Sequence, residues 1–185
     1  MTAADKVERL WFSPVIDAVF IKGLGSKLTP DLKTEIKKVG IDLDKLQPAY
    51  PVTQVHAICK LLIPVIYPGQ SEDEAFHQLG VSSMRGYTET LIGKALMQIL
   101  KLIGVRRSLL RMHTSMRSGN NYLETSANVV AGNCIDLTFS DVSGMPSFYR
   151  GILEQGGVMA HAKNLRVTTV ASAPPGHTFR VEWDE

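Results

Sequence analysis

Apolar side chains recur at intervals of three and four residues through most of the first two thirds of the chain, the spacing of amphipathic helices. Thr29 and Pro30 predict the start of one helix, because Thr29 can cap it and Pro30 suits its first position. Gly40 is expected to end this helix. Its inner stripe consists of Leu32, Ile36 and Val39.

Further helices are predicted downstream. A short segment is bracketed by Pro48, Pro51, Pro64 and Pro68, and within it Val52, Val55, Ile58, Cys59 and Leu62 recur at helical spacing. Ser71 and Glu74 form a capping box at the start of the next helix, which Gly80 is expected to close.

A longer helix is predicted over 82–103. Gly93 lies in its middle and favours a close helix crossing there, since glycine in a helix otherwise costs about 1 kcal/mol relative to alanine. The inner stripe of this helix is predicted to consist of Met84, Tyr87, Leu91, Ala95, Ile99 and Leu102.

After Gly119 the pattern changes to alternating and β-branched residues, which is typical of strands. Strands are predicted over 121–130, 135–141, 165–170 and 178–183, with a helix over 146–159 between the second and the third. The fold class is therefore α+β, with helical N-terminal two thirds followed by a small antiparallel sheet in β-β-α-β-β order. The predicted core combines Tyr87, Leu91, Leu96, Ile99, Phe139, Phe148, Ile152 and Val167.

Composition narrows the class of protein. A chain of 185 residues with 44% apolar and 21% charged residues fits one globular domain. A net charge of +2 is too small for a nucleic-acid binder. There is no signal-peptide pattern and no apolar run near the roughly 20 residues of a membrane span, so we expect a cytoplasmic protein. Cys59 and Cys134 give no disulfide framework.

Charge is uneven in one segment. From Thr90 to Leu123 the chain has no Asp or Glu but six basic residues, which are Lys94, Lys101, Arg106, Arg107, Arg111 and Arg117. This run could bind an anionic ligand or an acidic partner, or it could be the solvated face of a helix and a loop. Arg107 and Arg111 lie four residues apart and can act together, and Arg117 joins them if the chain turns back near 112–115.

No sequence motif indicates a reaction. The five histidines form no H-x-x-x-H pair, no Cys lies at zinc-site spacing and no G-x-S-x-G is present. The sequence predicts a protein that is not an enzyme and holds no metal and no cofactor.

Several blocks of sequence together resemble a known family. They are 28–30, 40–44, 48–51, 67–68, EAFHQLG at 74–80, GYTETLIGKAL at 86–96 and MRSGNNY at 116–122. In this order they resemble a myxobacterial paralogous family of roughly 200-residue proteins without an assigned function. The resemblance covers nearly the whole chain.

The chain is more distantly similar to haem-dependent nitric-oxide/oxygen-binding domains and to their haem-free vinyl-reductase-type and TRAPP-type relatives. The similarity implies a helical front and a C-terminal sheet with one helix. The Tyr-x-Ser-x-Arg motif that clamps the porphyrin falls on Thr138, Ser140 and Val142, so the haem propionates lose their charged partner. The proximal histidine falls near 105–108, where there is none, and His113 is the nearest alternative. The sequence therefore predicts no haem.

Two functions remain open. One is a non-enzymatic sensor or regulatory domain that binds a small anionic or apolar ligand between the helical front and the sheet. The candidate ligand-binding residues are Arg106, Arg107, Arg111, Arg117, Asn120 and Asn121. The other is a protein-interaction or assembly module without a ligand, which could form a homodimer. Asn120 and Asn121 could equally form a turn.

Overall fold

The computed structural model describes residues 7–184, apart from the side chain of Lys101. The helical front contains α1 (Ser13–Ile16), the π-helical turn η1 (Asp17–Lys22), the 3-10 turn η2 (Gly25–Lys27), α2 (Pro30–Lys38), α3 (Val52–Ile66), α4 (Glu72–Glu89), α5 (Leu91–Leu110) and α6 (Met112–Arg117). Two short strands, β1 (Leu10–Phe12) and β2 (Ala49–Pro51), pair antiparallel within it and were not predicted.

The C-terminal part has the predicted β-β-α-β-β order. It runs through β3 (Thr125–Ala131), β4 (Cys134–Phe139), α7 (Pro146–Met159), β5 (Lys163–Ala173) and β6 (Gly176–Asp184). The four strands form one antiparallel sheet in the order β3-β4-β6-β5. The α+β fold class is therefore confirmed.

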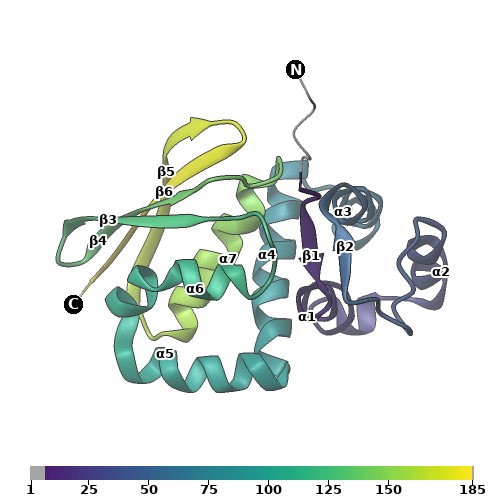
Figure 1. Cartoon of the computed structure of the whole chain (residues 1–185), viewed down its shortest axis with the longest axis horizontal. Helices are drawn as coiled ribbons and strands as arrows, with labels where there is room; N and C mark the ends of the chain where they lie inside the picture. The colour runs from purple at the N-terminus through teal and green to yellow at the C-terminus, as the bar shows by residue number, and fades with distance from the viewer. Residues whose placement is uncertain (1–6, 185) are drawn as a thin grey trace.

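The molecule is layered around α4. Figure 1 shows α4 near the centre, with α7 beside it toward the sheet and the N-terminal helices on its other side. Alternate residues of β4 and β6 are buried, and Phe139 of β4 meets Tyr149 of α7 with ring centroids 5.4 Å apart. The core thus extends from the sheet through α7 and α4 to η1 and α3.

Glycines allow α4 to lie very close to its neighbours. A Cβ on Gly80 would lie 2.0 Å from the carbonyl oxygen of Phe148 in α7, and one on Gly151 would lie 2.3 Å from that of His77. The two backbones therefore touch, and any side chain at these positions would push them apart. His77 Nε2 and Glu154 Oε2, 2.7 Å apart, add a polar contact along the same crossing.

Local start signals were predicted correctly. The Thr29 hydroxyl accepts a hydrogen bond from Leu32 N at 3.3 Å, and Ser71 and Glu74 form both bonds of the capping box. Pro51 and Pro68 flank α3 as predicted, whereas Pro64, which was also predicted to bracket this helix, lies inside its last turn.

The helix predicted over 82–103 is wrong in its boundaries. Gly80 does not end the preceding helix, because it is the contact glycine inside α4, which continues to Glu89. The break falls at Thr90, whose hydroxyl accepts a hydrogen bond from Gly93 N at 2.9 Å and caps α5. Gly93 is therefore in the first turn of α5 and lies against the carbonyl of Tyr87 rather than at a helix crossing.

The predicted core is right for the sheet side and wrong for α5. Phe139, Phe148 and Val167 are buried, and Tyr87, Leu96 and Ile152 are partly buried. Leu91 and Ile99 are instead exposed, because the new start of α5 turns their side of the helix outward.

Candidate ligand-binding site

An apolar cavity of about 160 Å³ lies among the helices. The side formed by α4 and α7 includes Met84, Tyr87, Phe148, Tyr149, Ile152, Leu153 and Gly156. The side formed by α5 and α6 includes Leu96, Leu100, Val105, Leu109, Met112 and Met116. An apolar cavity of about 150 Å³ stays dry and takes up benzene or xenon, so this cavity suits a ligand of about one aromatic ring.

Beyond its first turn, α5 approaches α4 and α7 through side chains, which leaves room for the cavity. Thr90 and Gly93 fix the start of α5 on the end of α4. At the other end, Gly104 has φ 76° and ψ 172°, which breaks the helix and redirects the chain. Between them Leu96 and Leu100 face α7, where Gly156 leaves space: a Cβ there would meet only Met84 Cε, at 3.7 Å.

Three aromatic side chains with polar tips stand at one end of the cavity. Trp11 and Tyr149 line it, and the Trp11 indole Nε1 donates to the hydroxyl of Tyr122 at 2.8 Å. Tyr149 is also hydrogen-bonded to Tyr122. Burial, together with the neighbouring Tyr122, raises the pKa of Tyr149 well above the usual range, so its phenol stays neutral.

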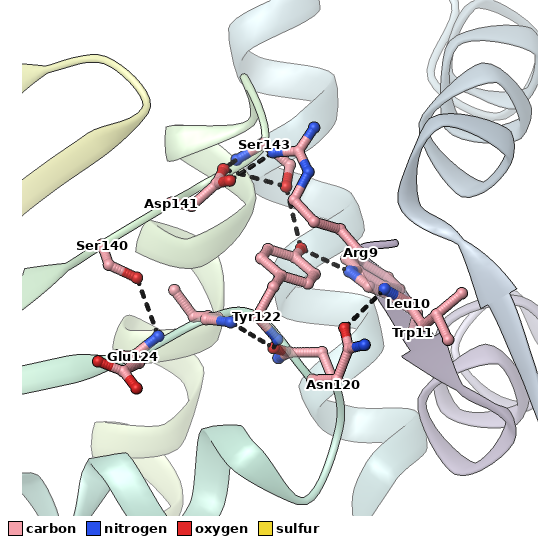
Figure 2. Close-up of polar contacts among 11 residues, drawn as sticks. Arg9, Leu10, Trp11, Asn120, Tyr122, Glu124, Ser140, Asp141 and Ser143 are labelled. Carbon is pink, nitrogen blue, oxygen red and sulfur yellow. Dashed lines mark hydrogen bonds and ion pairs between the residues drawn. The ribbon is translucent and has the colours of Figure 1, made fainter. Parts of the chain in front are cut away.

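Tyr122 connects this end of the cavity to the loop after β4. Figure 2 shows it at the centre of the contacts, between β1 and the loop that contains Asp141 and Ser143. Ser143 Oγ lies 2.9 Å from the Tyr122 hydroxyl, and Asp141 accepts a hydrogen bond from Ser143 N at 2.7 Å. Arg9 forms an ion pair with Asp141. These hydrogen bonds and the ion pair hold β1 in place, and they leave the cavity lining almost wholly apolar.

The four arginines predicted as ligand contacts are all exposed and lie outside the cavity lining. Arg106 and Arg107 are on α5 after the break at Gly104, Arg111 joins α5 to α6, and Arg117 ends α6. None of them forms an ion pair within residues 7–184. A role in binding an anion or an acidic partner stays a prediction for these residues.

The two predicted asparagines are engaged by the backbone. Asn120 is buried; its side-chain oxygen accepts from Leu123 N at 2.7 Å, and its amide donates to Met116 O. Asn121 pairs with β1, accepting from Leu10 N at 2.8 Å and donating to Glu8 O at 2.9 Å. These bonds support the turn interpretation, although Asn120 also lines the cavity.

The cavity does not lie where the ligand site was predicted. Among the described residues that line it, none comes from β3, β4, β5 or β6, because α7 stands between the cavity and the sheet. Sequence reasoning also missed Trp11, Tyr149 and the methionines of the lining. Their only signal was an excess of Met at helical positions 84, 112 and 116, which is typical of an adaptable apolar surface.

The described residues offer no metal centre. Across 7–184 there is no group of three or more His, Cys, Asp or Glu side chains that could hold a metal ion. None of the helices in this part of the chain has the length and apolar character needed to cross a membrane.

Solved structures with a similar fold are H-NOX domains. One is an oxygen-binding H-NOX domain related to soluble guanylate cyclases, solved as its oxygen complex; it is 16% identical, with a TM-score of 0.68 over 93% of this chain and 95% of that one. Another, from a study of H-NOX activation, is 17% identical with a TM-score of 0.68 over 95% and 97%. A mutant of the T. Tengcongensis H-NOX is 16% identical with a TM-score of 0.65 over 92% and 96%. At this identity the likeness shows the fold.

Haem does not fit the residues present. Within the described chain the cavity lining contains no His or Cys to bind iron and no Arg to hold a propionate. His113 is exposed, with Nε2 3.1 Å from the hydroxyl of Thr114. Thr138 contacts Thr178 on the sheet and Val142 is buried, so neither offers a charged group to a porphyrin.

A family model matches nearly the whole sequence. A comparison with curated proteins finds no match. The family model covers residues 9–184 and thus both the helical front and the sheet. The chain therefore belongs to the family described as protein of unknown function (DUF2378).

Proposed function

We propose that this chain is a non-enzymatic sensor domain that binds a small apolar molecule, of about one ring in size, in the cavity between α4, α7 and α5. The observation that carries this proposal is the cavity itself, which is of ligand size and has an almost wholly apolar lining.

The lining supports binding rather than catalysis. Its described residues include no His, Cys, Asp, Glu, Lys or Arg, which are the usual general acids, bases and nucleophiles. Its hydroxyl groups belong to serines such as Ser83 and Ser108 and to two tyrosines, and no base in the lining could activate them.

The placement of the cavity suits a sensor. A ligand there would touch the α4–α7 side and the α5–α6 side together, and would favour whichever arrangement of α5 packs best around it. The fold agrees with this role by analogy, since one neighbour is an oxygen-binding H-NOX domain. Here an apolar molecule would be held by packing alone and not by iron.

Methionine methyl groups provide a direct test. Met84, Met112 and Met116 line the cavity, whereas Met145 is buried elsewhere. Protein labelled with ¹³C at the methionine methyls would be titrated with benzene and followed by NMR. We expect saturable shifts at Met84, Met112 and Met116 and no shift at Met145.

A blocked cavity supplies the matched control. Gly156→Leu would extend a side chain toward Met84 and into the cavity, whereas Gly156→Ala adds only a methyl group. The leucine variant should lose the benzene shifts, and the alanine variant should keep most of them. Equal shifts at Met145, or unchanged shifts in the leucine variant, would contradict the proposal.

The broader identity of the protein stays predicted. A protein partner, a homodimer, a ligand-free assembly role, a cytoplasmic location, a myxobacterial source and kinship with vinyl-reductase-type or TRAPP-type domains are expectations from the sequence. Native mass spectrometry of the purified protein would report a retained small molecule and the oligomeric state together.

A further inference from the structure

The first part of α5 exposes four of its large apolar residues. Leu91 and Leu102 are each 86% exposed, Ile92 is 56% exposed and Ile99 is 48% exposed. Surface leucines scattered singly are ordinary, but a contiguous apolar patch marks an interaction site. We call these four residues the outer stripe.

Helical geometry places the outer stripe on one side. At about 100° per residue, Leu91, Leu102, Ile99 and Ile92 fall within roughly 100° of one another, and Ala95 lies among them. On the opposite side Met97 is buried, and Leu96 and Leu100 line the cavity. By their positions in the helix, Lys94, Gln98 and Lys101 take up one flank, whereas the outer stripe is apolar and has no cover among the described residues.

The charges carried by α5 all have one sign, although α4 ends on the exposed Glu89 just before it. Thr90 to Leu123 contains six Lys and Arg and no acidic residue. Lys94 borders the outer stripe and is exposed, as are Arg106 and Arg107 just after the break at Gly104. These three side chains have no ion-pair partner within residues 7–184. A binding partner that covers the outer stripe should therefore be apolar at its centre and anionic at its edge.

The geometry points to an anionic lipid surface: we propose that α5 lies flat on such a membrane, with the outer stripe in the acyl boundary and Lys94, Arg106 and Arg107 at the headgroups. Interfacial helices combine an exposed apolar face with basic residues in this way. From Leu91 to Leu102 the helix is about 16 Å long, enough for the four side chains to insert side by side.

Shape and charge favour this occupant over a protein. In Figure 1, α5 runs along the lower edge of the molecule, outside the other helices, so it presents a ridge that can approach a flat surface. A second copy of the chain docked through the same stripe would bring the same cations together without an acidic residue from 90–123 to offset them.

Vesicle co-sedimentation at low salt tests the proposal. The full chain would be mixed with vesicles of phosphatidylcholine alone or of equal parts phosphatidylcholine and phosphatidylglycerol. We expect binding to the phosphatidylglycerol vesicles only. Leu91→Ser with Leu102→Ser should weaken it at least tenfold, and so should Lys94→Glu with Arg106→Glu, since each basic residue near an anionic surface contributes several-fold.

Matched controls lie away from α5, one on α3 and one in the connection after α2. Val65→Ser removes an exposed apolar residue from α3, and Lys45→Glu reverses an exposed charge near α2. Both should bind vesicles as the parent does, and circular dichroism should show all variants folded. A second readout places Trp at the stripe: Leu102→Trp should shift its emission to the blue on phosphatidylglycerol vesicles.

Three outcomes would overturn the proposal. The parent chain could fail to bind phosphatidylglycerol vesicles, as expected if an acidic protein covers α5. The serine double variant could bind as well as the parent, which would mean attraction by charge alone. The Trp emission could stay unshifted on vesicles that sediment the protein.

Discussion

Helices α4 and α5 follow each other along the chain, and the more apolar of the two, α5, is the less closely packed. In α4, Gly80 lies against the backbone of α7 and Gly86 against that of η1. In α5, only Gly93 lies so close to another backbone, and the rest of the helix reaches its neighbours through side chains. One helix is therefore held in the core, whereas the other covers a cavity and exposes leucines. The difference comes from where the glycines allow close contact, rather than from hydrophobicity.

The largest expected contrast is between leucines of the two helices. Leu79 in α4 is fully buried, so Leu79→Ala should lower the free energy of unfolding by about 2 to 5 kcal/mol. Leu102→Ala, on the exposed side of α5, should change it by no more than about 0.5 kcal/mol. Leu96→Ala should fall between them, since Leu96 is partly buried beside an existing cavity. Urea unfolding of the three variants measures these free energies. Equal losses of free energy at positions 79 and 102 would contradict the difference in packing between α4 and α5.

Replacing either of two glycines of α7 by alanine should change the free energy of unfolding, in opposite directions at the two positions. Gly151→Ala places a methyl 2.3 Å from the carbonyl of His77 and should destabilise by about 1 to 3 kcal/mol. Gly156→Ala meets only Met84 Cε at 3.7 Å and should stabilise by up to about 1 kcal/mol, the helix preference of alanine over glycine. Thermal unfolding distinguishes them, and a loss of stability at both positions would show that α7 is packed as tightly at Gly156 as at Gly151.

The smallest expected effect concerns pH and the sheet. Burial lowers the pKa of His177 below its ordinary 6.5, and its Nε2 lies 3.0 Å from the Thr169 hydroxyl. The unfolded chain therefore takes up a proton on His177 at a higher pH than the folded chain does. The contribution of neutral His177 to the free energy of unfolding is complete above about pH 6.5 and declines as the pH falls below that value. Unfolding in urea at pH 7.5 and pH 5.5 should show a smaller decline in His177→Gln than in the parent. An equal decline in both would mean that other groups cause it.

Local signals along the sequence predicted most of the elements. The caps at Thr29 and Ser71 and the alternation after Gly119 depend on residues close together, and each was confirmed. Gly80 was wrongly predicted to end a helix, because a single sequence does not distinguish a glycine that ends a helix from one that lets two helices touch. The Thr90 cap was missed because the helical spacing of apolar residues continues from α4 into α5 without a break.

The site was harder to predict than the fold. Its lining combines Trp11 of β1 with residues of α4, α5, α6 and α7, which only tertiary packing brings together. The orientation of α5 could not be read from its stripe, because apolar residues cover most of the helix surface and two different apolar sides could face inward. Asn121 was predicted as a ligand contact because its amide can form hydrogen bonds. Its partners are instead backbone groups of Leu10 in β1 and of Glu8 just before it.

Helix α7 separates the cavity from the sheet and contacts both. Ile152 and Gly156 line the cavity, as does Tyr149, whose ring also packs on Phe139 of β4. The side chain of Leu165 in β5 lies directly over Gly157. A shift of α7 would therefore be transmitted to β4 and β5, and it would be detectable at the exposed face of the sheet.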